Sequence, residues 1–225
     1  MAPVEQLHDG SALMDIRCLP IGVRRPMPGV TYPPIADLER YLASGALEAR
    51  SLAAAFRGSF DRNKGRIALI GDGWSLTYDA LDILSDRAAL AFAKLGLQPL
   101  DRIIFQVGNS PNLVVAVLGC LKAGLIPLCT LHAHREVEIA GLGNHAAAKA
   151  HFIDTSSESF DFNGFSAHIR TRVPSLQRTV VVNGKPAADA LVMAELIDAV
   201  DAEEARAFVQ QCVMALDTKI RVNFA

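Results

Sequence analysis

The chain has 225 residues, of which 51% are apolar, and its 22 basic residues nearly balance its 24 acidic residues. This composition is typical of a globular protein of one large or two small domains, and the charge balance gives no electrostatic reason to expect nucleic acid or a membrane as a partner. The four cysteines form no C-x-x-C pair and residues 1–10 contain no apolar leader segment. We therefore expect neither a disulfide framework nor a zinc site, and a cytoplasmic location.

Residues 1–34 contain five prolines from position 20 onward, which block a regular helix and predict an extended arm. Two short helical patterns follow, over residues 35–42 and 48–60. Residues 66–70 and 74–77 flank a Gly-Asp-Gly sequence, which is typical of a β-hairpin with its turn.

The clearest helical pattern covers residues 78–95. Leucine and alanine recur there at spacings of three and four, which predicts one buried face packed on a sheet. These residues are Leu81, Leu84, Ala88, Ala91 and Leu95. Thr77 is suited to cap the start of this helix, and Gly96 can end it in a left-handed turn.

Strand and helix patterns alternate from residue 102 onward. The expected strands cover residues 102–107, 125–131, 150–154 and 179–183, and the expected helices cover residues 111–123, 134–145, 162–173, 187–200 and 202–211. Ser110 and Pro111 fit the N-cap and first position of a helix. Strand–helix–strand repetition with short links predicts an α/β fold with a doubly wound, mostly parallel sheet.

Residues 112–131 form an apolar run about as long as a membrane-spanning helix. Lys122, Gly124 and Pro127 interrupt the run, and a lysine in the lipid core would cost roughly 3 kcal/mol. A helix followed by a buried strand accounts for the same residues, so we expect no membrane segment.

Other patterns bear on cofactors and metals. Residues 141–146 fit the dinucleotide fingerprint G-x-G-x-x-A, but a predicted helix rather than a strand precedes them, and the acidic Asp154 follows too soon. Four histidines also lie close in sequence: His132, His134, His145 and His151. No carboxylate or cysteine spacing completes a metal site with them, and nucleophile-elbow and phosphate-loop motifs are absent. The residues alone therefore predict no catalytic residue, no cofactor-binding residue and no metal ligand.

Three segments carry a family resemblance when their order and spacing are taken together. Residues 74–81 read WSLTYDAL, close to a (T/S)YxEL motif with Ala80 in place of glutamate. Residues 96–127 follow the pattern G…GDRV…N…LKAGA-P, with Leu100 in place of a glycine, and residues 133–139 contain an AHR..EI run. These segments resemble the adenylate-forming superfamily of acyl-CoA synthetases and aryl-acid–AMP ligases, in particular the branch with 2,3-dihydroxybenzoate–AMP ligases.

The resemblance implies a two-step ligase. A carboxylate reacts with ATP to give an acyl-adenylate and pyrophosphate, and the thiol of coenzyme A or of a carrier pantetheine then takes the acyl group. This chemistry uses glycine-rich backbone amides, a lysine and Mg²⁺ around the phosphorus, which the family carries in a [S/T]GTTGxPK loop and later motifs absent from this sequence. The resemblance thus implies ATP, Mg²⁺ and coenzyme A or pantetheine for the intact family, and no cofactor for this chain alone. It leaves His134 and Arg135 as candidates to border the acid pocket.

We interpret residues 1–34 as an extended arm, residues 35–211 as a partial N-terminal ligase domain, and residues 212–225 as a divergent tail in which residues 219–224 alternate like a strand. Three functions stay open: a truncated ligase that is inactive alone, one half of a split ligase completed by a second chain, and a non-catalytic α/β binding module. The expected partners are a complementing ligase chain or further copies of this chain, because exposed apolar area and an unpaired sheet edge favour self-association.

Overall fold

The computed structural model describes residues 34–48 and 50–224, without the side chains of residues 35 and 215–224. The arm expected at residues 1–34 lies, apart from its last residue, outside the described residues. The helices are α1 (Ile35–Ala43), α2 (Leu52–Arg62), α3 (Tyr78–Lys94), α4 (Pro111–Lys122), α5 (Glu136–Ala146), α6 (Phe162–Arg172), α7 (Met193–Asp198) and α8 (Ala202–Phe224). The strands are β1 (Ile67–Gly71), β2 (Trp74–Thr77), β3 (Arg102–Gln106), β4 (Ile126–Cys129), β5 (Ala150–Thr155), β6 (Arg178–Gly184) and β7 (Leu191–Val192).

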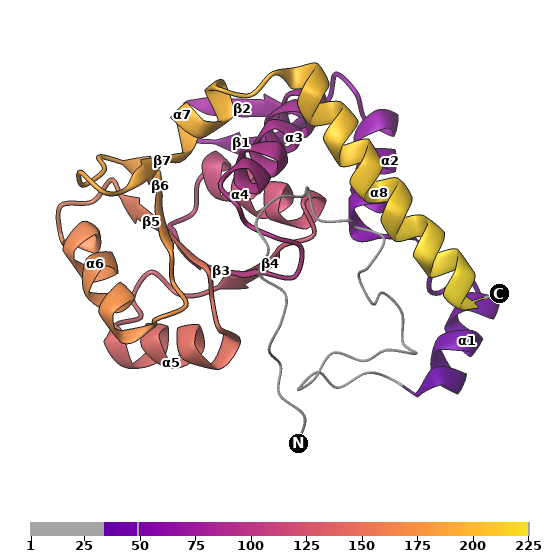
Figure 1. Cartoon of the computed structure of the whole chain (residues 1–225). Helices are drawn as coiled ribbons and strands as arrows, with labels where there is room; N and C mark the ends of the chain where they lie inside the picture. The colour runs from indigo at the N-terminus through magenta and orange to yellow at the C-terminus, as the bar shows by residue number, and fades with distance from the viewer. Residues whose placement is uncertain (1–33, 49, 225) are drawn as a thin grey trace.

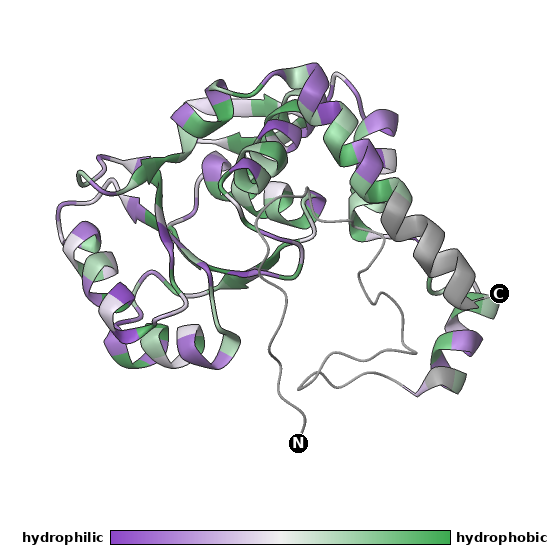
Figure 2. Cartoon of the chain, in the orientation of Figure 1, coloured by the Kyte–Doolittle hydropathy of each residue, from purple (hydrophilic) through white to green (hydrophobic). Residues whose placement is uncertain are grey.

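A parallel sheet of five strands forms the centre of the fold, with the strand order β4-β3-β5-β6-β7. Alternate residues of its strands point to opposite faces: Ile103 and Phe105 face the core shared with α3, α4 and α7, whereas Ile104 packs with α5 and α6. Helices therefore cover both faces, as Figure 1 shows, and green apolar residues run along β4 and β6 in Figure 2. The predicted doubly wound α/β fold is confirmed.

The helix α3 has the predicted ends. The Ala80 N–H donates to Thr77 Oγ1 over 3.3 Å, and Gly96 has a φ of +87° just after the helix. Its packing differs from the prediction, because α3 contacts α4 and α8 most extensively and reaches the large sheet mainly through Phe92. A second layer of helix thus lies between much of α3 and the sheet.

The contact between α3 and α4 depends on a small residue in α4. A Cβ atom at Gly119 would lie 2.7 Å from the Cβ of Ala88, so glycine allows the two helices to approach closely. The start of α4 is capped as predicted, with the Leu113 N–H donating to Ser110 Oγ over 3.1 Å and Pro111 in the first turn.

The apolar run at residues 112–131 divides into α4 and β4, as expected. Within the described part of the chain, no helix has both the length and the apolarity that a membrane crossing requires. The dinucleotide-like residues 141–146 lie inside α5, where the close approach of Gly143 to Val173 and Ile104 gives the glycine a packing role.

Two predicted segments were wrong. The helix expected over residues 187–200 is limited to α7, and Leu191 and Val192 before it form β7. These two residues pair with β6 and extend the sheet, because tertiary pairing overrides a helical pattern of this length. The strand-like residues 219–224 belong to α8, which runs through the expected tail. No glycine or proline occurs between positions 202 and 224, so nothing ends the helix, and adding residues to an existing helix is easier than starting a new element.

Candidate functional site

The order of the strands marks one place where a site is expected. In open α/β sheets, ligands bind outside the carboxyl ends of the strands where the strand order reverses. Here the reversal lies between β3 and β5, because the chain passes from β3 to β4 on one side and then returns to β5 on the other. The residues at this edge are Gln106 of β3, Asp154 of β5, Asn183 of β6, Ser110 before α4, and the 130–135 loop after β4.

Asp154 is the centre of a polar network at this edge. Its Oδ1 accepts hydrogen bonds from the N–H and hydroxyl of Ser156, and its Oδ2 accepts one from Asn183 Nδ2 over 2.8 Å. The same Asn183 amide donates to Ser110 Oγ over 3.0 Å, and its oxygen accepts from Asn112 over 2.9 Å. The network therefore joins β5 and β6 to the first turn of α4.

The network keeps Asp154 ionised. Burial alone would raise the pKa of this carboxyl, but hydrogen bonds from Ser156, Asn183 and the Gly108 amide outweigh burial and leave the pKa below its ordinary value. A carboxylate that already accepts these bonds is suited to hold the edge of the sheet in one geometry, and poorly suited to act as a general base.

Gln106 connects this edge to the predicted candidate His134. The Gln106 side chain is fully buried, and its Nε2 donates to the carbonyl oxygens of His134 (2.7 Å) and His132 (3.4 Å). Only the NH₂ group can make these bonds, so the amide orientation is fixed. The Gln106 Oε1 and the His134 Nδ1 are both buried and find no hydrogen-bond partner among the described residues.

Arg135 is the N-cap residue of α5, and its guanidinium lies 3.9 Å from the ring centroid of Phe160. The ring of His132 lies 4.2 Å from that of Phe162, and the two phenylalanine rings meet edge to face with 4.8 Å between centroids. The loop after β4 therefore places His132 and Arg135 against the rings of Phe160 and Phe162, which follow β5. The structure brings both candidates, His134 and Arg135, to the carboxyl edge of the sheet.

Gln106, Asp154 and Asn183 were not found as site residues from the sequence. Each occurs at or near the end of a correctly predicted strand, and the carboxyl ends of parallel strands share one edge of the sheet. A search for polar residues at predicted strand ends could have found them.

The fit of a metal ion to these residues is poor. The described residues contain no group of three or more His, Cys, Asp or Glu side chains that could hold a metal. The oxygens of Asp154 already accept from Ser156 and Asn183. Asp154 therefore offers no open carboxylate oxygen at this edge for Mg²⁺.

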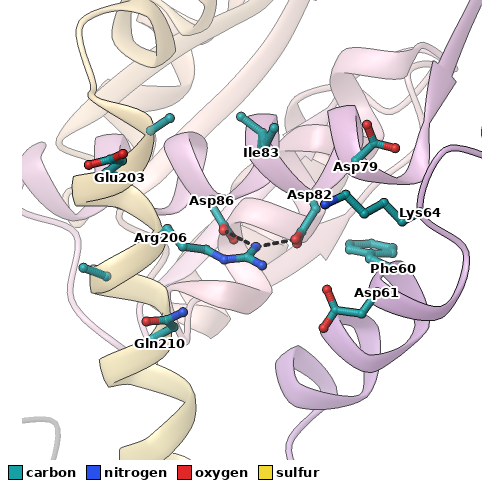
Figure 3. Close-up of a pocket in the computed structure, with 12 residues that line it drawn as sticks. Phe60, Asp61, Lys64, Asp79, Asp82, Ile83, Asp86, Glu203, Arg206 and Gln210 are labelled. Carbon is teal, nitrogen blue, oxygen red and sulfur yellow. Dashed lines mark hydrogen bonds and ion pairs between the residues drawn. The ribbon is translucent and has the colours of Figure 1, made fainter.

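A second cluster of polar side chains lines a cavity of about 460 Å³ between α2, α3 and α8 (Figure 3). At its base, the buried Lys122 Nζ contacts Asp82 Oδ1 (2.6 Å) and Asp86 Oδ1 (2.7 Å), and also donates to Ser85 Oγ (2.8 Å). Arg206 of α8 binds both carboxylates, and the dashed lines of Figure 3 mark these bonds.

This cavity is better explained by structure than by ligand binding. Arg57 also binds Asp86, at 3.0 and 3.1 Å, so three cations surround two acids. Burial alone would raise the pKa of Asp82, but Lys122 and Arg206 reverse the effect and lower it. Lys122 thus ties α4 to α3, and the carboxylates are already paired.

The sheet and the polar network at its switch point define a doubly wound α/β protein with a candidate site at the carboxyl edge. The family model of the AMP-binding enzymes matches residues 56–215. The chain belongs to this family of AMP-binding enzymes.

Its relatives include ligases that act on aryl acids. The chain is 30% identical over 152 residues to the vibriobactin-specific 2,3-dihydroxybenzoate-AMP ligase of Vibrio cholerae, an alignment that covers 68% of this chain and 28% of the relative. It is 31% identical over 173 residues to a salicyl-AMP ligase / salicyl-S-ArCP synthetase of Mycobacterium tuberculosis, covering 72% of this chain and 30% of that protein. The chain thus spans less than a third of the length of these relatives.

Solved structures agree with this relationship. The apo structure of Mycobacterium smegmatis MbtA matches with a TM-score of 0.71 and 29% identity, over 77% of this chain and 32% of MbtA. A benzoate CoA ligase from Burkholderia xenovorans matches with a TM-score of 0.55 and 25% identity, over 68% of this chain and 29% of that ligase.

Proposed function

We propose that this chain is part of an AMP-dependent ligase for an aryl or acyl acid, acting in the cytoplasm, and that the described domain has no adenylation activity alone. In the complete reaction, the carboxylate attacks the α-phosphorus of ATP, pyrophosphate leaves, and a thiol then displaces AMP from the acyl-adenylate. The thiol belongs to coenzyme A or to a carrier pantetheine.

One observation carries this proposal. The residues that match the AMP-binding family, 56–215, are the residues that form the parallel sheet and its helices, and the fold matches MbtA over 77% of the chain. The named relatives activate 2,3-dihydroxybenzoate and salicylate, which supports an aryl acid. The lack of activity alone is supported by the sequence, which contains no glycine-rich phosphate loop.

We also propose that His134 and Arg135 border the acid pocket of the complete enzyme. Both lie at the carboxyl edge of the sheet, where the Arg135 guanidinium stacks on Phe160 and donates to the carbonyl oxygens of His132 and His134. A guanidinium beside aromatic rings is suited to an aromatic carboxylate, which offers both a negative charge and a ring.

The first test measures ATP–pyrophosphate exchange. The purified chain should show no exchange that depends on salicylate, 2,3-dihydroxybenzoate or benzoate, because preorganised donors around the phosphate each contribute several kcal/mol to the transition state. The intact salicyl-AMP ligase of M. tuberculosis serves as the positive control. Acid-dependent exchange by the chain alone would show that it carries its own phosphate site.

The second test uses a chimera in which residues 35–211 replace the matching segment of that salicyl-AMP ligase. A folded chimera should regain acid-dependent exchange if this segment is a working part of a ligase. A chimera that is folded by circular dichroism but inactive with all three acids would contradict the proposed function and favour a non-catalytic module.

The chimera also tests the acid-pocket residues. Arg135→Ala should raise the KM for the acid about tenfold with little change in kcat, because the lost contact exists in both ground and transition states. His145→Ala, in an exposed position on the same helix α5, is the matched control and should leave both constants unchanged. Equal effects of the two substitutions on KM would contradict the assignment of Arg135 to the acid pocket.

A further inference from the structure

The side chain of Gln106 is polar although its position is fully buried. It ends β3 after three buried apolar residues, and alternation along the strand places it on the face that Ile104 turns towards α5 and α6. Burial of an amide is costly unless its N–H groups find acceptors. Both acceptors of Gln106 Nε2, the carbonyl oxygens of His132 and His134, belong to the loop between β4 and α5. The amide thus anchors this loop to the sheet.

The two carbonyl oxygens that accept from Gln106 also accept from Arg135. Arg135 Nη1 donates to the His132 oxygen over 3.0 Å and to the His134 oxygen over 2.8 Å. Each NH₂ group has two N–H bonds and each carbonyl oxygen has two lone pairs, so the four groups form one closed set of hydrogen bonds. We call this set the carbonyl clamp. Gln106 lies on its buried side and Arg135 on its exposed side.

The carbonyl clamp determines the direction of the Arg135 guanidinium. This group is planar, its Nη1 points at the two carbonyl oxygens, and its central carbon lies 3.9 Å from the centroid of the Phe160 ring. The edge formed by Nε and Nη2 is therefore directed away from the carbonyl oxygens. A carboxylate can bind such an edge through two parallel hydrogen bonds. A shift of the carbonyl oxygens would turn this edge.

We propose that Gln106 is a positioning residue of the acid pocket. Through the carbonyl clamp, it holds the Arg135 guanidinium in the direction in which the guanidinium receives the carboxylate of the acid, and Gln106 itself does not touch the acid. The inference rests on the proposed function for the presence of the acid. The effect of Gln106 on Arg135 is a property of this chain alone and can be measured without ligase activity.

NMR of the full-length chain measures the direction of the guanidinium. The ring current of Phe160 shifts the Arg135 Nε proton upfield, and the two hydrogen bonds at Nη1 slow the rotation of that NH₂ group. The wild type should therefore show an upfield Nε–H signal, which Arg135→Lys identifies by removing it, and separate signals for the two Nη1 protons. Wild-type Nη1 protons that are averaged by fast rotation would overturn the proposal without any substitution.

Gln106→Met keeps the length of the side chain but removes the donor. The Arg135 Nε–H signal should lose most of its upfield shift and move towards its position in Phe160→Leu, which lacks the aromatic ring. An unchanged signal in a folded Gln106→Met chain would overturn the proposal, because the guanidinium would then keep its direction without the amide.

Thr130→Val is the matched control. It removes another hydrogen bond between the same loop and β3, from Thr130 Oγ1 to the Phe105 oxygen over 2.8 Å, while the Thr130 N–H still donates to that oxygen. This variant should leave the Arg135 signal in place. Equal shifts in Thr130→Val and Gln106→Met, each shown to be folded by circular dichroism, would mean that any loosening of the loop moves Arg135, and would overturn a specific role of Gln106.

The ligase chimera tests the consequence for the acid. Gln106→Met should raise the KM for the acid roughly three- to tenfold with little change in kcat, whereas a merely structural role would reduce the amount of folded enzyme and so lower kcat at constant KM. In the Arg135→Ala background, Gln106→Met should change KM less than about twofold, because an effect that passes through Arg135 is already lost there. The same increase in both backgrounds would overturn the proposal. A folded but inactive chimera would instead contradict the proposed function, and the NMR comparison would still decide whether Gln106 positions Arg135.

Discussion

Leu100 adopts a positive φ of 72°, in the left-handed region that favours glycine. It precedes β3, and its N–H donates to the Gly124 carbonyl over 2.8 Å, which joins the entry to β3 with the turn that ends α4. The adenylate-forming pattern has a glycine at this position. The departure of Leu100 from that pattern therefore has a backbone cost in this chain.

Glycine at position 100 should be more stable than alanine there. Leu100→Ala and Leu100→Gly lose the same side-chain contacts, but only glycine relieves the left-handed strain, which costs an L-residue roughly 1–2 kcal/mol. After the greater chain entropy of unfolded glycine is subtracted, the free energy of unfolding should be about 1 kcal/mol higher for the glycine variant than for the alanine variant. Urea unfolding measures both values. Ala123→Gly, where φ is −84°, is the control and should lose stability.

His151 makes stability depend on pH. It is fully buried in β5, its Nδ1 shares a hydrogen bond with Ser166 over 3.0 Å, and its Nε2 has no partner among the described residues. Burial lowers its pKa from 6.5 to about 3. Between these values the unfolded chain binds a proton at His151 that the folded chain does not. The contribution of His151 to the free energy of unfolding is therefore fully present above pH 6.5 and is lost as pH falls towards 3.

The free energy of unfolding should therefore fall by about 1.4 kcal/mol per pH unit below pH 6.5 from this residue. The clearest range is pH 6.5 to 4.5, above the range in which Asp82 and Asp154 titrate, since both have lowered pKa values. His151→Gln keeps a partner for Ser166 and does not titrate. Urea unfolding of the wild type and of His151→Gln gives the free energy of unfolding at each pH. If it changes with pH equally in the two proteins over this range, His151 is not the group responsible.

At the scale of elements, prediction succeeded where signals were local. The hairpin of β1 and β2, the caps of α3 and α4, and the left-handed turn at Gly96 follow from neighbouring residues. Two of the failures depended on distant contacts. β7 exists only because β6 lies beside it, and the face of α3 was matched to the wrong partner, because periodicity identifies a buried face without identifying what covers it.

The candidate site was partly predictable for the same reason. His134 and Arg135 came from a family resemblance, which carries information about three-dimensional position. Gln106, Asp154 and Asn183 belong to three separate strands, and only the parallel register of the sheet brings them to one edge. The ion network of Lys122 with Asp82 and Asp86 connects residues 36 to 40 positions apart, so no local pattern indicated it.

At the scale of the whole molecule, this network unites helices from distant parts of the sequence. Arg57 of α2, Lys122 of α4 and Arg206 of α8 all converge on Asp86 of α3, whose side chain is 2% exposed. A buried carboxylate with several cationic partners is costly to remove, because the cations then remain without compensation in a medium of low polarity. The network should thus be a main source of cooperativity between α8 and the rest of the fold.

Asp86→Asn should lower the free energy of unfolding by about 3–5 kcal/mol, because the amide keeps the shape of the side chain while the buried cations lose one of two counter-charges. Glu204→Gln is the matched control: Glu204 pairs with Lys94, and both side chains are about half exposed, so its loss should cost under about 1 kcal/mol. Both values come from urea unfolding followed by circular dichroism. A neutral or stabilising Asp86→Asn would mean that the carboxylate is retained at the expense of stability, as ligand-binding residues often are, and the cavity of Figure 3 would then replace the sheet edge as the candidate site.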